Sequence, residues 1–193
     1  MENKLINNRE ADQILKEGEW HTAYIALGSN MGNRMEHLRR ALKLIDSSQY
    51  CRVEKISPIY ETEPYGNVEQ DRFLNGAAEI QTLLTPPKLM DALLKIEGEL
   101  KRERTIHWGP RTIDLDIIFY DDIISSDPHI ILPHPGVHER LFVLKPLCDI
   151  APALLHPLRK ESCCGLARAL EGKQEEPRLY KEAIEPSGPL KPL

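Results

Sequence analysis

Two acidic side chains, Asp114 and Asp116, lie within Ile113–Tyr120, a segment with the apolar and β-branched content of a strand. Side chains alternate along a strand, so both carboxylates should face one side, with their Cα atoms about 6.6 Å apart. Carboxylates placed in this way can bind one or two hard cations. Mg²⁺ commonly takes one or two protein carboxylates and completes its shell with water and substrate phosphates. The simpler alternative is a solvated strand face that carries two acids.

Basic side chains crowd the same stretch. Arg111 stands three residues before Asp114, and more cations precede it. Cations after a helix can merely complement its dipole. A magnesium-bound polyphosphate, however, requires carboxylates for the metal and arginine forks for the phosphate oxygens. The combination therefore favours a phosphate site. The upstream cations are Lys101, Arg102, Arg104 and His107.

A histidine between two prolines, His134, is followed six residues later by Arg140. Such a histidine lies on a rigid, non-helical loop, where ligand-contacting residues are common. Taken alone, the pattern is more typical of a surface turn.

The segment Gly28–Arg34 (GSNMGNR) resembles a glycine loop between a strand and a helix. It lacks the Gly-Lys-Ser/Thr ending of a P-loop, and the chain has no G-x-G-x-x-G. We therefore expect a turn in which Asn30 or Asn33 caps the following helix.

An aromatic residue and an amide, Phe73 and Asn75, would share one strand face. This pair could recognise a flat heterocycle. Composition cannot distinguish that role from ordinary core packing, to which Phe73, Trp108 and Phe142 would otherwise be assigned.

The elements that must position these residues follow the order βαββαβ. This order is typical of a ferredoxin-like α+β sandwich, a mainly antiparallel sheet with helices packed on it. Short apolar stretches follow at 130–132 and 141–147, and a short helix is expected at 162–170. The expected strands are 22–27, 51–62, 73–83 and 113–120, and the two helices start at 33 and 86.

Bulk composition indicates one globular domain with tails. The 193 residues are 41% hydrophobic and 28% charged, with a net charge of −5. We expect a polar extension at 1–21, the domain at 22–160, and a C-terminal extension at 161–193 that is partly helical and then a loose, Pro-rich tail. The acidic balance argues against a nucleic-acid partner. No apolar run suits a membrane span or a signal peptide, so we expect a cytoplasmic protein.

The four cysteines form no C-x-x-C pair, and we expect reduced thiols. A zinc site is the alternative, although the spacings match no common ligand pattern. Its ligands would be Cys148, His129, His134 and His138.

Five segments together resemble the 6-hydroxymethyl-7,8-dihydropterin pyrophosphokinase family: AYIALGSNMGNR, SPIYETEPYG, FLNGAAEI, WGPRTIDLDII and LPHPGVHERLFVLKPLCDIAP. They occur in the family's order and cover about Thr22 to Pro157. The WGPRTIDLDI stretch is far more specific than a lone D-x-D.

The resemblance implies a ferredoxin-like enzyme that transfers the diphosphate of ATP to the pterin hydroxymethyl group and releases AMP. It implies two Mg²⁺ ions held by Asp114 and Asp116, with Asp116 also helping to deprotonate the attacking hydroxyl. The implied catalytic residues are Arg102, Arg111 and Asp116. The implied ATP contacts are Glu97, Arg104, Trp108, Ile117, His134 and Arg140. The implied pterin contacts are Thr62, Tyr65, Phe73, Asn75 and Phe142, the first two through backbone.

Three positions depart from the family's commoner pattern. His107 stands where arginine is frequent, Glu63 where proline is frequent, and Phe73 where tyrosine also occurs. Two alternatives stay open: a ferredoxin-like small-molecule or nucleotide binding module, and another Mg-dependent enzyme such as a nucleotide hydrolase. For the leading hypothesis we expect a monomer whose partners are ATP and the pterin.

Overall fold

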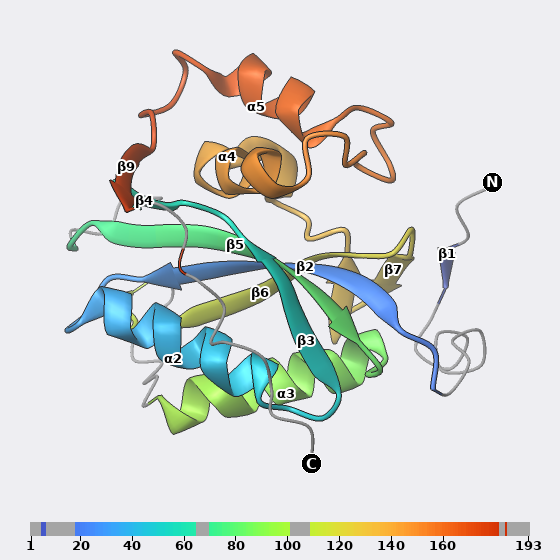
Figure 1. Ribbon diagram of the computed structural model, residues 1–193. Coiled ribbons are helices and arrows are strands. Elements are labelled where there is room, and N and C mark those ends of the chain that lie inside the picture. The colour runs from blue at the N-terminus through green and yellow to red at the C-terminus, as the bar shows by residue number, and fades with distance from the viewer. Residues whose placement is uncertain (1–4, 7–17, 65–69, 101–108, 182–183, 185–193) are drawn as a thin grey trace.

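The fold of this chain is a twisted sheet with helices on both faces. The computed structural model describes residues 5–6, 18–64, 70–100, 109–181 and 184. Helices α2 and α3 cover one face of the sheet (Figure 1). Helix α4 covers part of the other face, and α5 lies on the side of α4 that is away from the sheet. The sheet with α2 and α3 on one face is the arrangement expected of a ferredoxin-like α+β sandwich, and α4 and α5 add a second helical layer.

The main sheet has the strand order β6-β2-β5-β4-β9, with β3 also paired to β5, and all of these pairings are antiparallel. The central strand β2 therefore lies between β6 and β5, which carry the candidate chemistry. The strands are β2 His21–Ser29, β3 Cys51–Ile56, β4 Ile59–Thr62, β5 Phe73–Thr82, β6 Asp114–Tyr120 and β9 Arg178–Lys181.

The first two helices begin where their local sequence signals stand. In α2, Arg34–Asp46, the Asn33 side chain accepts from the Glu36 N–H at 3.2 Å, so Asn33 and not Asn30 is the cap. Helix α3, Pro86–Glu99, starts with two prolines, which its first turn tolerates. Both helices bury apolar stripes against the sheet, and the larger core cluster includes Ile25, Leu27, Leu38, Leu42, Leu89, Leu93, Leu115 and Ile117.

The apolar stretch 141–147 is part of a helix, α4, Leu141–Ile150, which sequence analysis did not predict. Pro146 lies inside this helix. A proline there argues against a helix, because it removes one helical hydrogen bond. Burial of Leu144 and Leu147 against Phe119 and Ala77 compensates. The predicted short helix near 162–170 is confirmed as α5, Cys163–Leu170, which Ser162 caps.

The predicted single strand 51–62 is two strands, β3 and β4, separated at Ser57-Pro58. The Ser57 N–H donates to the Ala77 carbonyl, and its hydroxyl accepts from the Ala77 N–H, each at 2.9 Å. Because Pro58 has no N–H for the ladder, the serine supplies the pairing with β5 between the two strands.

The C-terminal extension is not wholly a loose tail. Strand β9 pairs with β4, and Ile184 packs against the larger core cluster. A smaller sheet joins β1, Leu5–Ile6, in parallel to β7, Ile124–Asp127, which pairs with β8, Ile130–Leu132.

The 3₁₀ turn η1, Val137–Glu139, leads into α4. Within the described ranges, no helix combines the length and apolarity that crossing a bilayer requires. All four cysteines are free thiols.

Candidate functional site

Gly28, on the central strand, is the meeting point of the site. It pairs with Asn75 of β5 on one side and with Asp114 of β6 on the other. A Cβ placed on Gly28 would lie 3.0 Å from Asn75 Oδ1, 3.7 Å from Asp114 Cβ and 3.8 Å from Phe73 Cδ1. These side chains therefore share one sheet face, which we call the site face. The missing Gly28 side chain keeps its centre open.

The two aspartates lie on the site face as the alternation predicted. Leu115 and Ile117 are buried in the core with α2 and α3, whereas Asp114 and Asp116 are half-buried. The side chain of Ile117 thus points away from the aspartates, and a nucleotide contact from this residue would have to use its backbone.

Glu97 of α3, only 2% exposed, anchors the strand between the two aspartates. Its Oε1 accepts from the Leu115 N–H at 2.8 Å. Glu97 was expected among the ATP contacts, and in the structure its carboxylate holds the backbone of β6 in position. A buried acid held in this way fixes the backbone that presents both carboxylates.

Arg111 lies beside the first aspartate, with Nη1 at 2.5 Å from Asp114 Oδ2. Its backbone is fixed by Asn30, which is 2% exposed: Asn30 Oδ1 accepts from the Arg111 N–H at 2.7 Å, and the Asn30 N–H donates to the Arg111 carbonyl at 3.1 Å. Asn30 Nδ2 also donates to Gln70 Oε1 and to the Asp71 carbonyl. Asn30 thus ties two loops together, a role that sequence analysis missed.

His134 is held as a neutral imidazole near the aspartates. The backbone N–H of His134 donates to the Ile118 carbonyl of β6 at 3.0 Å. The ring Nδ1 accepts from the Gly136 N–H at 3.2 Å, which leaves the ring proton on Nε2. Burial first, and then the positive charge of Arg140, lower the pKa of His134 to about 4, against an opposing effect of Asp114. At neutral pH His134 is therefore an N–H donor without charge.

Arg140 folds back over Gly136. A Cβ on Gly136 would lie 2.9–3.1 Å from the Arg140 guanidinium atoms. The guanidinium can take this position because the glycine has no side chain. His134, Arg140 and Asp114 are close enough for the Arg140 charge to lower the pKa of His134 and for the Asp114 charge to oppose that shift.

Two of the predicted pterin residues, Asn75 and Thr62, are in direct contact. Asn75 Nδ2 donates to Thr62 Oγ1 at 2.7 Å, and both side chains are buried. Phe73 is half-buried at the start of β5, and Phe142 is half-buried in the first turn of α4. The side chain of Thr62 thus holds Asn75 in place, whereas only a backbone contact was expected from Thr62.

A polar staple fastens α4 to β4. The Tyr60 hydroxyl donates to Asp149 Oδ2 at 2.6 Å, and Lys145 Nζ donates to the Tyr60 hydroxyl at 2.9 Å and pairs with Asp149. Because Tyr60 is 6% exposed, these partners satisfy a polar group that would otherwise be costly to bury.

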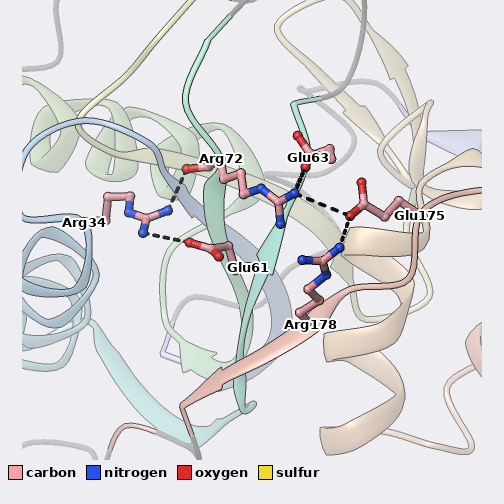
Figure 2. A network of polar contacts seen from close by, with 6 residues as sticks. All are labelled: Arg34, Glu61, Glu63, Arg72, Glu175 and Arg178. Carbon is pink, nitrogen blue, oxygen red and sulfur yellow. Dashed lines mark hydrogen bonds and ion pairs between the residues drawn. The ribbon is translucent and has the colours of Figure 1, made fainter.

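Figure 2 shows a chain of ion pairs at the ends of β4 and β5. The Arg34 guanidinium donates to Glu61 Oε1 at 2.8 Å and to the Arg72 carbonyl at 2.7 Å. Arg72 pairs with Glu63, so the glutamate that departs from the family pattern has a charged partner. The network continues through Glu175 to Arg178.

Some predicted residues lie outside the described part of the chain: Tyr65, Arg102, Arg104, His107 and Trp108. Among the described residues, no group of three or more His, Cys, Asp or Glu side chains is arranged to hold a metal. The alternative zinc site of Cys148, His129, His134 and His138 is therefore not assembled. Asp114 and Asp116 remain as two hard oxygen donors on one face, a set that fits Mg²⁺ when phosphate and water complete its shell.

The fold is shared with solved structures. The wild-type HPPK-DHPS of Plasmodium falciparum superposes with a TM-score of 0.66 at 16% identity, over 81% of this chain and 44% of that one. At this identity the likeness concerns the fold.

Sequence relatives are closer. The 2-amino-4-hydroxy-6-hydroxymethyldihydropteridine pyrophosphokinase of Bacillus subtilis is 44% identical over 160 residues, covering 83% of this chain and 90% of the relative. The bifunctional protein FolKE of Lactococcus lactis is 45% identical over 129 residues, or 67% of this chain, and the chain spans only 37% of that protein. The sequence profile of the 7,8-dihydro-6-hydroxymethylpterin-pyrophosphokinase (HPPK) family matches residues 24–152. The chain therefore belongs to the HPPK family.

Proposed function

We propose that this protein transfers the diphosphate of ATP to the hydroxymethyl oxygen of 6-hydroxymethyl-7,8-dihydropterin, producing AMP and the pterin diphosphate for folate synthesis. One observation carries the proposal beyond family membership. Gly28 separates the acid and arginine group of β6 from the aromatic and amide group of β5 by one strand, about 4.8 Å on each side. A phosphate site and a heterocycle site therefore adjoin.

The acid side of the site suits a magnesium-bound polyphosphate. Asp114 and Asp116 would hold Mg²⁺, two ions in our proposal, on the site face. When bound, the metal would offset the negative charge of the phosphate oxygens. Arg111, already beside Asp114, supplies a planar fork that can turn to a phosphate and bind it through two hydrogen bonds.

On the same side, His134 and Arg140 offer phosphate contacts of two kinds. The neutral His134 can donate one N–H, and Arg140 adds a permanent charge. In the family's pattern Arg102 and Arg104 clamp further phosphate oxygens, while Glu97, Trp108 and Ile117 line the nucleotide site. The contributions of these five residues stay predictions.

The opposite side suits a flat, hydrogen-bonding ring. Phe73 from β5 and Phe142 from α4 would stack on the two faces of the pterin, and Asn75 would bind its edge. The Thr62 hydroxyl holds the Asn75 side chain in place before the pterin binds, so less conformational entropy is lost on binding. Tyr65 stays a predicted contact through its backbone.

The reaction then depends on position and charge. Holding the pterin oxygen in line with the β-phosphorus supplies the entropic part of the rate. Asp116, on β6 at the acid side of the site, would take part in removing the hydroxyl proton. Arginine side chains would balance the charge that develops on the phosphate oxygens. We keep the predictions of a monomeric state and a cytoplasmic location as part of this proposal.

Product analysis tests the proposal. The purified protein is incubated with Mg-ATP, with and without the pterin, and the nucleotides are separated. AMP that forms only with the pterin, matched by pterin diphosphate, is the expected result. ADP, or hydrolysis without the pterin, would instead identify a nucleotide hydrolase. Bound ATP with no turnover would point to a binding module.

Carboxylate variants test the metal assignment. Asp114→Ala or Asp116→Ala should abolish turnover and keep the fold, whereas Asp122→Ala, at an exposed turn position after β6, should leave turnover unchanged. Removing Mg²⁺ with a chelator should stop the unaltered protein, and adding it back should restore activity. Near-normal activity in either site variant would refute the assignment.

A further inference from the structure

The N-terminus of α4 is capped by a residue from far along the chain. Gln174 Oε1 accepts from the Leu141 N–H at 3.1 Å, and its Nε2 donates to the Glu139 carbonyl at 2.8 Å. The N-cap residue of α4, Arg140, makes no side-chain capping bond of its own. Since a helix start leaves backbone N–H groups without helical partners, the distant glutamine completes it.

The two bonds of Gln174 enclose the residue that the proposed function assigns to phosphate. Glu139 and Leu141 are the direct neighbours of Arg140, and Phe142 follows one residue later. The glutamine therefore fixes the backbone from which both the phosphate-binding arginine and one ring-stacking phenylalanine project. Gln174 itself lies outside residues 24–152, the part of the chain that the family profile matches.

The residues after Gln174 bind the opposite side of the site. Glu175 Oε1 lies 3.3 Å from Arg178 Nη2 and 3.9 Å from Arg72 Nη2 (Figure 2). Arg72 directly precedes Phe73, the other proposed stacking residue.

Strand β9 then pairs with β4, placing Arg178 opposite Glu61, one residue before Thr62. The Arg34 guanidinium also lies 5.8 Å from the centre of the Tyr180 ring. In Figure 1 the chain runs from α5 down to the edge of β4, so it connects the helical layer with the sheet.

We propose that Gln174–Lys181 is a strap that sets the separation of the two walls of the pterin site, with Gln174 as the positioning residue for Arg140 and Phe142. This inference rests on the proposed function and adds a determinant outside the matched family region. The two walls come from segments about 70 residues apart. Lys145 and Asp149, further along α4, are already bonded to Tyr60 of β4. The strap adds a tie at the N-terminal end of α4, beside Arg140 and Phe142, and joins it to the wall that carries Phe73.

The variant Gln174→Leu tests the strap, because it removes both hydrogen bonds and keeps the side-chain size. The pterin KM should rise about five- to tenfold, which corresponds to about 1–1.4 kcal/mol of lost binding free energy, with kcat changed less than twofold. Gln174→Glu keeps the acceptor for the Leu141 N–H and should recover part of the affinity. Amide hydrogen exchange at 141–143 should accelerate in Gln174→Leu.

Gln81→Leu is the matched control. It makes the same exchange at the far end of β5 and removes one bond to Thr22 Oγ1. It should leave the pterin KM unchanged. If Gln174→Leu behaves like this control, or if exchange accelerates without any change in KM, the strap is refuted as a positioning element. Absence of AMP formation by the unaltered protein would instead refute the proposed function itself.

Discussion

The substitution Gly28→Ala should impair pterin use and spare ATP use. The new Cβ would lie 3.0 Å from Asn75 Oδ1, where ordinary contact begins at 3.4 Å, so the amide must move by about 0.4 Å. The same Cβ lies 3.7 Å from Asp114 Cβ, an ordinary contact that displaces nothing on the phosphate side. The perturbation is therefore confined to one of the two substrates.

The size of the effect follows from one hydrogen bond. Asn75 is held by Thr62 at 2.7 Å and cannot move without weakening either that bond or the bond that we propose it makes to the pterin. A neutral hydrogen bond contributes about 0.5–1.5 kcal/mol net, so the pterin KM should rise about two- to tenfold. Gly28 has no positive φ, and alanine lowers the entropy of the unfolded chain. Its gain of about 0.4–1 kcal/mol opposes the crowding, so stability should change by less than about 1 kcal/mol.

Steady-state kinetics with each substrate varied in turn give the test. AMP formation is followed at saturating ATP and varied pterin, and then the reverse. Gly98→Ala is the control, since its Cβ would meet nothing within 4 Å and it lies on the exposed side of α3. A pterin KM unchanged in Gly28→Ala would refute the geometry, and so would an equal rise in the KM for ATP.

Three further outcomes are expected. Asn30→Ala removes three buried side-chain hydrogen bonds that tie the Arg111 backbone to a second loop, so urea unfolding should show a loss of about 2–3 kcal/mol. Gly136→Ala should displace the Arg140 guanidinium and raise the KM for ATP about three- to tenfold. The pterin KM should rise less, and an equal rise in both KM values would contradict the assignment of Arg140 to the ATP phosphates. Burial lowers the pKa of His156 from 6.5 to about 4, so the unfolded chain binds this proton more readily, and stability should fall as pH drops from about 6.5 to 4 and stay level above. Between pH 7 and 5 the unaltered protein should lose on the order of 1–2 kcal/mol more than His156→Asn in urea unfolding, after allowance for solvent screening.

Local patterns in the sequence determined much of this protein. Alternation in Ile113–Tyr120 predicted that Asp114 and Asp116 share a face, and the cap at Asn33 was one of two amides that capping chemistry favours. The element order predicted the ferredoxin-like fold. These features depend on side-chain periodicity and on contacts between residues that are close in sequence, so the sequence itself displays them.

Where a local signal opposed the outcome, prediction from sequence failed. Pro146 concealed α4, and Pro58 divided a strand that was expected to be continuous. At Pro146 the burial of neighbouring apolar side chains outweighed the local preference, whereas at Pro58 the missing N–H interrupted the strand. The polar, Pro-rich composition of the tail likewise concealed β9, whose residues are all exposed and carry no apolar alternation.

Strand register and long-range hydrogen bonds were decided by the tertiary structure alone. The sequence contains Gly28, Asn75 and Asp114 but does not state that they are lateral neighbours; pairing on both sides of β2 makes them so. Likewise Glu97 binds the strand between the aspartates, and Gln174 caps a helix 33 residues earlier. Such pairings minimise the free energy of the whole packed chain, because each depends on which surfaces are buried together. The sequence by itself thus determined the chemistry available to this protein, and only the packed chain determined which residues hold it in place.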